Sequence, residues 1–399
     1  MIYLDNNATT AIDPRVVSAI NSVWAWGPMN PSSQHGWGRT AKNLFDDAIG
    51  EIGQLLGAAV DTPGGDTLVV TSGGTEANNL ALRGLGDPNG PLVISRIEHP
   101  SVLETAASLA ATGRPLRAIP ALACGQIDLE AAAELILQAS PRPTLVSVMS
   151  ANNETGVIQP IEALANLCAQ AAVPLHVDAT QSVGKLPLDF ASSGITALTA
   201  TAHKFHGPVG VGLLLVRASV PLSPQIVGGG QQLDSRGGTE PVALVVGMAE
   251  ALRLALENGA GQAQRMRRLR DGFEQKLRSR FEELVVHGAD APRLPGTTLV
   301  SLPRVDRQMM LLALDAAGVA CSSGSACSSG SSTPSHVLEA IGAAPQLRET
   351  ALRFGFSRLS TSQEAERAVE IIARQYQRLR DGAVAEELGH SSASGEETG

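Results

Sequence analysis

Residues 175–185 read Leu-His-Val-Asp-Ala-Thr-Gln-Ser-Val-Gly-Lys, a short apolar run that ends in an aspartate and a glutamine. A short apolar run bounded by polar and turn-forming residues is typical of a buried β-strand. A carboxylate at the tip of such a strand is costly unless it has a fixed partner. Asp178 is therefore expected either to cap a helix or to belong to a functional site.

The same pattern recurs along the chain. From about residue 14 to residue 257, short apolar runs alternate with stretches rich in Ala and Leu, which predicts β–α–β units and a mostly parallel sheet. Because the runs are apolar throughout, helices should cover both faces of the sheet, and ligands should bind beyond the carboxyl ends of the strands. The predicted strands are residues 67–71, 92–95, 145–148, 175–178 and 212–216.

The 399 residues exceed one typical domain. A long helix is expected over residues 241–280, after which strands, helices and a Ser/Gly-rich loop follow one another. We expect a large domain over residues 15–257 and a smaller α+β domain that combines residues 1–14 with residues 258–381. The polar residues 382–399 are expected to form a disordered tail.

Charge and composition restrict the class of function. A formal net charge of -9 argues against a nucleic-acid surface. No apolar run is long enough for a membrane helix, and the first residues lack the features of a secretory signal. The four cysteines, Cys124, Cys168, Cys321 and Cys327, lack the spacing of a zinc site or a disulfide framework. We expect a protein of the reducing cytoplasm, with no metal, nucleic-acid or membrane partner.

Polar residues follow the other predicted strands as well. Gly74 and Thr75 open a helix, where backbone N–H groups and a hydroxyl can hold a phosphate, although an ordinary helix start fits equally well. His99, Asn153 and Gln181 follow three further strands. With several such residues on neighbouring strand ends, a site is the better interpretation for Asp178 too.

Lysine is scarce in this chain. Lys204 stands between a histidine and an apolar Gly-Pro turn, whereas Lys42 and Lys276 lie in helical stretches near acidic residues. A desolvated lysine, unlike arginine, loses its proton readily and can form a Schiff base. Lys204 is the main candidate for this role and Lys185 the rival; the alternative for Lys204 is a surface cation placed there by chance.

These residue types together are those that pyridoxal 5′-phosphate requires. Gly74 and Thr75 would hold the phosphate, Lys204 would form the Schiff base, Asp178 would keep the pyridine nitrogen protonated, and His99 would lie against the ring. The sequence therefore predicts a site for this cofactor at the carboxyl edge of the sheet.

Cys327 lies in a stretch of small polar residues, Cys-Ser-Ser-Gly-Ser-Ala-Cys-Ser-Ser-Gly-Ser-Ser over residues 321–332. Free thiols are usually buried, so a cysteine in such a stretch is expected to be mobile and reactive. A flexible linker with an incidental cysteine is the alternative. We expect residues 322–332 to be mobile in the absence of substrate.

Ordered blocks along the chain resemble the cysteine desulfurases of the class-V aminotransferase group, in the subgroup of the NifS and IscS proteins. The resemblance implies the type I pyridoxal-phosphate fold, with a seven-stranded, mostly parallel sheet in the large domain, and a homodimer with active sites at the subunit interface. The blocks are residues 3–10, 30–36, 71–79, 98–99, 152–157, 177–185, 203–204 and 322–327.

The resemblance also implies roles for single residues. Lys204, not Lys185, would carry the cofactor, and Cys327 would take the sulfur of L-cysteine as a persulfide, releasing L-alanine. Its thiol pKa of ~8.5 must be lowered, or a base such as His99 must take the proton. Arg353 would bind the substrate carboxylate. The implied cofactor residues are Gly74, Thr75, His99, Asn153 (also near substrate), Asp178, Gln181 (near the phenolic oxygen), Thr201, His203 and Lys204, with Thr239 from the partner subunit.

Two features depart from the family or stay open. Gln232 and Leu233 stand where the family has Glu and Arg, and Gly237 where it has Ser, so the contacts around Thr239 are in doubt. Cys321 precedes Cys327 by six residues. It could be inert, pair with Cys327 in a disulfide, or relay sulfur.

The rival functions are a selenocysteine lyase, an aminotransferase of the same fold, and a catalytically silent redox sensor or scaffold. Cys327 argues against a plain aminotransferase, and the long Ser/Gly loop around it against a selenocysteine lyase. Lys204, Asp178, His99 and Arg353 argue against a silent fold. The expected function is desulfuration of L-cysteine, with sulfur passed to an acceptor such as an iron–sulfur scaffold protein.

Overall fold

The computed structural model of the chain describes residues 1–60, 62–323 and 335–393, with the backbone alone for residues 382–393. Cys327, and most of the segment over residues 322–332 that is predicted to be mobile, lie outside this description.

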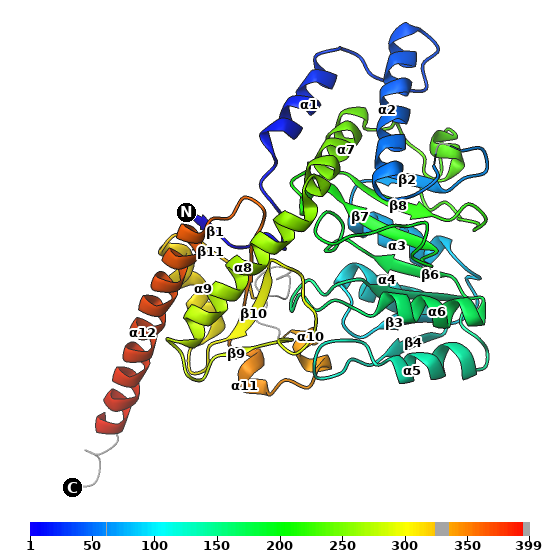
Figure 1. Ribbon diagram of the computed structural model, residues 1–399. Helices are drawn as coiled ribbons and strands as arrows, with labels where there is room; N and C mark the ends of the chain where they lie inside the picture. The colour runs from blue at the N-terminus through cyan, green and yellow to red at the C-terminus, as the bar shows by residue number, and fades with distance from the viewer. Residues whose placement is uncertain (61, 324–334, 394–399) are drawn as a thin grey trace.

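A seven-stranded sheet with the order β2-β8-β7-β6-β5-β3-β4 forms the centre of the large domain (Figure 1). Neighbouring strands are parallel except β8, which runs antiparallel to β2 and β7. The predicted fold class and the five predicted strands are confirmed. The strands are β2 (Thr67–Thr71), β3 (Leu92–Ser95), β4 (Leu116–Ile119), β5 (Leu145–Met149), β6 (Leu175–Asp178), β7 (Ala197–Thr201) and β8 (Gly212–Val216).

Helices cover both faces of this sheet, as the apolar strands require. Successive residues of β8 point to opposite faces, so Leu213 and Leu215 join one core cluster while Leu214 and Val216 join another. The first face carries α1 (Pro14–Trp24), α2 (Gly36–Leu55), α5 (Leu129–Ala133), α6 (Ile161–Ala171) and α7 (Val242–Leu256); the second carries α3 (Gly74–Gly84) and α4 (Pro100–Ala111).

The smaller domain has a core of its own, formed by residues from Ile2 to Tyr376 that lie far apart in the sequence. Strand β1 (Ile2–Tyr3) pairs in parallel with β11 (Val319–Ala320). An antiparallel sheet has the order β12-β10-β9, from β12 (Ala351–Gly355), β10 (Thr297–Ser301) and β9 (Val285–Val286). The helices of this part are α8 (Gly259–Arg278), α9 (Arg307–Ala316), α10 (His336–Ala340), α11 (Pro345–Arg348) and α12 (Ser362–Ala393). The two clusters do not separate strictly at residue 257, because Leu299, Val337, Leu338, Ile341 and Ala351 belong to the core of the large domain. The division at residues 14 and 257 therefore stays a proposal.

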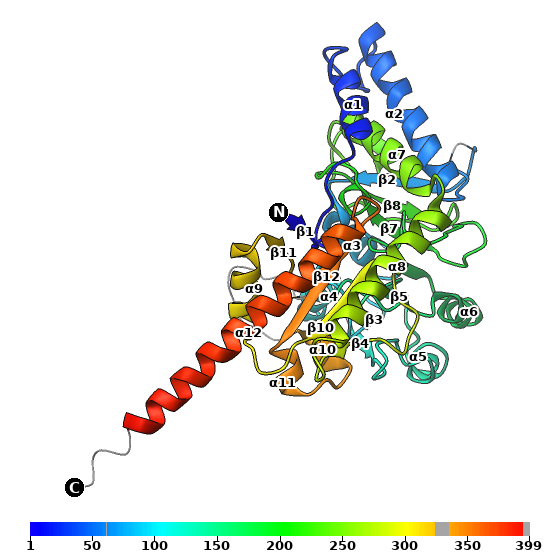
Figure 2. The same ribbon diagram turned by 60° about the vertical axis from the view of Figure 1, so that its left-hand side comes forward.

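Two expectations differ from the structure. The helix predicted over residues 241–280 is two helices, α7 and α8, separated at Asn258, whose φ of 51° is left-handed and breaks the helical path. Asparagine adopts this conformation more readily than most residues. The backbone of α12 is helical to Ala393, past residue 382, where the tail is expected to begin (Figure 2). Ala, Glu and Leu over residues 383–388 favour a helix.

The N-terminal segment connects the two domains. Asn6 Nδ2 donates a hydrogen bond of 2.8 Å to the Gly355 carbonyl of the small domain, and Thr10 N donates one of 2.9 Å to the His203 carbonyl of the large domain. Among residues 1–60, 62–323 and 335–393, no helix is long and apolar enough to cross a membrane.

Phe273 is the aromatic centre of the small-domain core, with ring centroids 5.0 Å from Phe354 and 5.3 Å from Phe356. We expect Phe273→Ala to lower the free energy of unfolding by about 3–5 kcal/mol, because it leaves a cavity. The matched control Leu122→Ala removes a 45% exposed side chain and should change it by less than about 0.5 kcal/mol. Urea unfolding measures both; similar effects would contradict this assignment of the core.

Candidate active site

A cavity lies at the carboxyl edge of the sheet, between the large domain and residues of α9, β11 and β12. Thr239 is exposed and does not line it, and Cys327 lies outside the described residues. The cavity brings together ten of the residues predicted from the sequence: Gly74, Thr75, His99, Asn153, Asp178, Gln181, Thr201, His203, Lys204 and Arg353.

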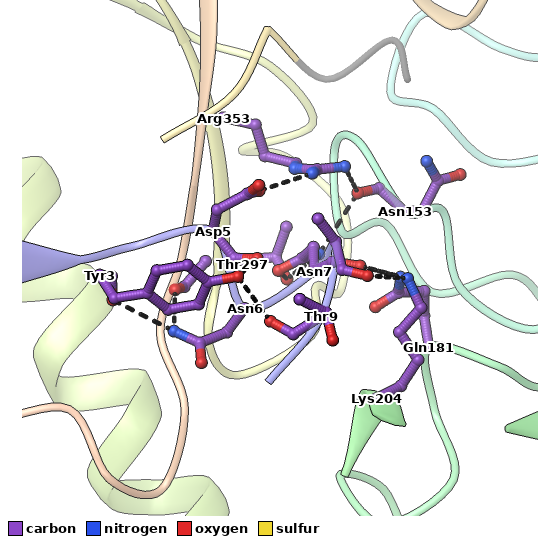
Figure 3. A network of polar contacts seen from close by, with 12 residues as sticks. Tyr3, Asp5, Asn6, Asn7, Thr9, Asn153, Gln181, Lys204, Thr297 and Arg353 are labelled. Carbon is purple, nitrogen blue, oxygen red and sulfur yellow. Dashed lines mark hydrogen bonds and ion pairs between the residues drawn. The ribbon is translucent and has the colours of Figure 1, made fainter. Parts of the chain in front are cut away.

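Lys204 follows β7 in a short 3-10 turn and points toward the N-terminal segment (Figure 3). Its Nζ donates hydrogen bonds of 2.7 Å to the carbonyl oxygens of Asn7 and Ala8. Burial, and next the charge of Arg353, lower the pKa of Lys204 to about 8. About a tenth of this amine is therefore unprotonated at pH 7, far more than for an ordinary lysine with a pKa of about 10.4, and the unprotonated amine is the form that makes a Schiff base.

Asp178 ends β6 and is held by two donors. Asn78 Nδ2 donates to Oδ2 at 2.8 Å and Thr180 N donates to Oδ1 at 2.9 Å. Asn78 also donates to Ser101 Oγ at 2.8 Å, and Ser101 contacts His99. The carboxylate and the histidine are thus fixed relative to one another through one amide.

His99 caps α4 and accepts a hydrogen bond of 3.1 Å from Ser101 N at Nδ1. Burial lowers the pKa of His99, so the ring is neutral and carries its proton on Nε2. The lone pair of Nδ1 faces Ser101, and the N–H group of Nε2 points away from Ser101 and can donate to another partner. This arrangement does not favour the predicted role of His99 as the base for the Cys327 thiol.

The start of α3 offers a place for a phosphate. A Cβ atom on Gly74 would lie 3.2 Å from Thr180 Oγ1, so glycine keeps this corner of the cavity open. Nearby, His203 Nδ1 lies 3.1 Å from Thr9 Oγ1, and burial lowers the pKa of His203 to about 4. A helix N-terminus, hydroxyl groups, a fixed carboxylate and a desolvated lysine form a set that fits pyridoxal 5′-phosphate.

Arg353 reaches the cavity from β12. Its Nη2 forms an ion pair of 2.8 Å with Asp5 Oδ1, and its Nη1 donates to the Asn153 carbonyl at 3.0 Å. Its backbone N also donates to the Ser322 carbonyl at 2.6 Å, so the strand that presents the guanidinium anchors the start of the Cys327 segment.

Sequence reasoning missed Asp5, Asn7, Asn78 and Ser101 as site residues. The Asn7 carbonyl accepts from both Lys204 and Gln181, and Asn7 Nδ2 donates to Thr297 Oγ1 of β10 at 2.9 Å. The available signal was that Asp5, Asn7 and Asn78 fall in the family blocks over residues 3–10 and 71–79.

The departure at Gln232 has a structural explanation. Gln232 Oε1 accepts from Val70 N at 2.6 Å and Gln232 Nε2 donates to the Val70 carbonyl at 3.0 Å, so the amide pairs with the outer edge of β2. A glutamate could not donate to that carbonyl. Arg236, in the same loop, forms a two-point ion pair with Glu76 of α3, which holds the loop that carries Thr239 against its own subunit.

Cys321 lines the cavity, and burial raises the pKa of its thiol to about 12. Since the thiolate is the reactive form, this favours the inert interpretation over a sulfur relay.

A family model described as Aminotransferase class-V matches residues 2–368, and the fold and site agree with it. Solved structures are similar over nearly the whole chain. A NifS-like protein from Rickettsia africae has a TM-score of 0.86 and 32% identity, covering 94% of this chain and 99% of that one. SspA in complex with cysteine has a TM-score of 0.78 and 30% identity, covering 90% and 100%.

Curated relatives narrow the assignment. A cysteine desulfurase of Sinorhizobium fredii is 38% identical over 384 residues, 95% of this chain and 97% of that protein. One of Gluconacetobacter diazotrophicus is 39% identical over 398 residues, 97% and 98%. The chain belongs to the cysteine desulfurase family within the class-V aminotransferases.

The lowered pKa of Lys204 has a measurable consequence if this residue is the one that binds pyridoxal 5′-phosphate. The rate at which pyridoxal 5′-phosphate attaches to the cofactor-free protein should rise with pH and level off above about pH 8, since the unprotonated amine is the nucleophile. Stopped-flow absorbance measures it, with Lys204→Ala as the control that forms no covalent band. A rate still rising at pH 10, near an ordinary lysine pKa of about 10.4, would contradict the prediction.

Proposed function

We propose that the protein uses pyridoxal 5′-phosphate to remove the sulfur of L-cysteine, releasing L-alanine and leaving a persulfide on Cys327. The observation that carries this proposal is the convergence of Lys204, Asp178 and Arg353 on one cavity. The desulfurase relatives support the choice of reaction.

The residues of the cavity divide the work. When bound, the cofactor withdraws electrons from the amino acid attached to it, which weakens the bonds at Cα and then Cβ. Asp178 would keep the cofactor nitrogen protonated, Gly74, Thr75, Thr201 and His203 would hold the phosphate, and Lys204 would carry the cofactor and hold the Cα proton.

Substrate binding would fall to Arg353 and Asn153. The guanidinium can present two parallel N–H groups to a carboxylate, and a substrate carboxylate would replace Asp5 as its partner. His99 would lie against the cofactor ring as a neutral donor. Cys327 would attack the substrate sulfur as a thiolate, so that the C–S bond breaks as the S–S bond forms and no external oxidant is needed.

The persulfide chemistry has a direct test. Cys327→Ala should lose more than about a thousandfold in alanine formation from L-cysteine, because its nucleophile is gone, yet keep the cofactor absorption. Cys124→Ala removes a thiol that does not line the cavity and should leave the rate unchanged. Alanine and sulfide release are measured together, with persulfide labelling of Cys327.

Full activity of Cys327→Ala on L-cysteine would overturn the proposal. Turnover of L-selenocysteine but not L-cysteine by the unaltered protein would favour the selenocysteine lyase instead.

We also propose a homodimer in which Thr239 of one subunit completes the cofactor site of the other. Thr239 lies outside its own cavity, so it can take this role only from a second copy. Large apolar side chains are exposed on the single chain, including Trp24 at 61%, Val227 at 80% and Leu233 at 88%. A subunit interface would bury some of these side chains, which are of the apolar and aromatic types found at interface cores.

A hybrid dimer tests this arrangement. One subunit carries Lys204→Ala and the other Thr239→Val. If Thr239 acts across the interface, one site of the hybrid contains neither change and should bind the cofactor like the unaltered protein. If Thr239 acts within its own chain, the hybrid should show only the weakened affinity of Thr239→Val. Analytical ultracentrifugation checks that the species is a dimer.

We further propose that the protein acts in the cytoplasm and passes its sulfur to an acceptor protein such as an iron–sulfur scaffold. A persulfide is discharged by a thiol or a reductant, so a thiol-bearing acceptor fits the product. The free cysteines among the described residues, Cys124, Cys168 and Cys321, agree with a reducing compartment.

A further inference from the structure

Lys185, the rival lysine of the sequence, lies behind the site and contacts it through one amide. Lys185 Nζ donates to Gln181 Oε1 at 3.0 Å. Gln181 Nε2 in turn donates to the Asn7 carbonyl at 2.9 Å, and Lys204 Nζ donates to the same carbonyl at 2.7 Å. The two lysines are therefore connected through Gln181 and Asn7.

The chemistry of these partners sets the orientation of the Gln181 amide. Its oxygen and nitrogen ends have nearly the same shape, so hydrogen-bond partners decide which way it points. An ammonium group has only donors, which places the amide oxygen against Lys185. A carbonyl only accepts, which places the NH2 group against Asn7.

The position of Lys185 is costly for folding. Its surroundings include Gly184, Phe205 and Met266, which line a small cavity that also reaches Lys204. Burial, and next the charge of Lys204, lower the pKa of Lys185 to about 7. A buried cation subtracts from stability unless it is well paired. Both the charged and the neutral amine keep N–H donors, so the contact with Gln181 survives loss of a proton.

We propose that Lys185 is a positioning residue that holds the amide of Gln181 with its NH2 group toward the cofactor cavity. By the family resemblance, Gln181 would lie near the phenolic oxygen of the cofactor. That oxygen accepts hydrogen bonds, so it needs the NH2 end of the amide and not its carbonyl end. The inference rests on the proposed cofactor site, and it gives a role to Lys185, which has none in that site otherwise.

The test compares cofactor binding by four variants: Lys185→Met, Lys185→Arg, Gln181→Leu and the double variant Lys185→Met/Gln181→Leu. Lys276→Met is the matched control, because Lys276 is exposed and pairs with Glu366. The cofactor-free proteins are titrated with pyridoxal 5′-phosphate, and the dissociation constant and absorption maximum of the bound cofactor are recorded.

Lys185→Met should weaken cofactor binding about five- to tenfold, the scale of one hydrogen bond, and shift the absorption maximum. Lys185→Arg, which keeps N–H donors, should restore both. The double variant should bind no more weakly than Gln181→Leu alone, because Lys185 acts through Gln181. Lys276→Met should match the unaltered protein.

Unchanged affinity and absorption in Lys185→Met would overturn the inference, as would losses that add in the double variant. Lys185→Gln, a smaller side chain with N–H donors, gives a second comparison that does not depend on the Met variant folding. Failure of the unaltered protein to bind pyridoxal 5′-phosphate would overturn the proposed function as well. Equal affinity of the unaltered protein and Lys185→Met for this cofactor would overturn the inference about Lys185 alone.

Discussion

Asn7 connects the lysine of the candidate active site with both domains of the protein. Its carbonyl accepts hydrogen bonds from Lys204 and Gln181 of the large domain, while the Asn7 side chain donates to Thr297 of the small domain. A desolvated ammonium needs acceptors and a buried carbonyl needs donors, so each satisfies the other. The same residue therefore lines the cavity and forms part of the contact between the two domains.

The charges that line the cavity are largely balanced. Lys204 and Arg353 lie there together with Asp5 and Asp178, and Asp5 forms an ion pair with Arg353. Close by, burial raises the pKa of Glu98 to about 8, so this acid adds less negative charge. A substrate carboxylate would therefore compete with Asp5 for the guanidinium of Arg353.

The ends of the Cys327 segment are held by residues of the same site. At one end, the backbone of Ser322 pairs with that of Arg353. At the other, Ser335 Oγ donates to Glu154, and His336 Nε2 lies 2.9 Å from the carbonyl of Glu98, the residue before His99. The chain on either side of the proposed nucleophile is therefore attached to Arg353 at one end and, at the other, to the residues next to Asn153 and His99.

The local sequence predicted five strands of the large sheet, the helices on both of its faces and the polar residues at the strand ends, because these follow from the spacing of apolar residues along the chain. It did not indicate β4 and β7, the other two strands of that sheet. It also singled out Lys204, since lysine is scarce. Only the tertiary structure shows the contacts of Asp5, Asn7 and Asn78 with the site, and the contact of Lys185 with Gln181. Asn7 and Lys204 are 197 residues apart, and no local pattern encodes which distant donor meets which acceptor. These pairs form because burial removes water from the polar groups, and each buried donor or acceptor must then form a hydrogen bond within the protein.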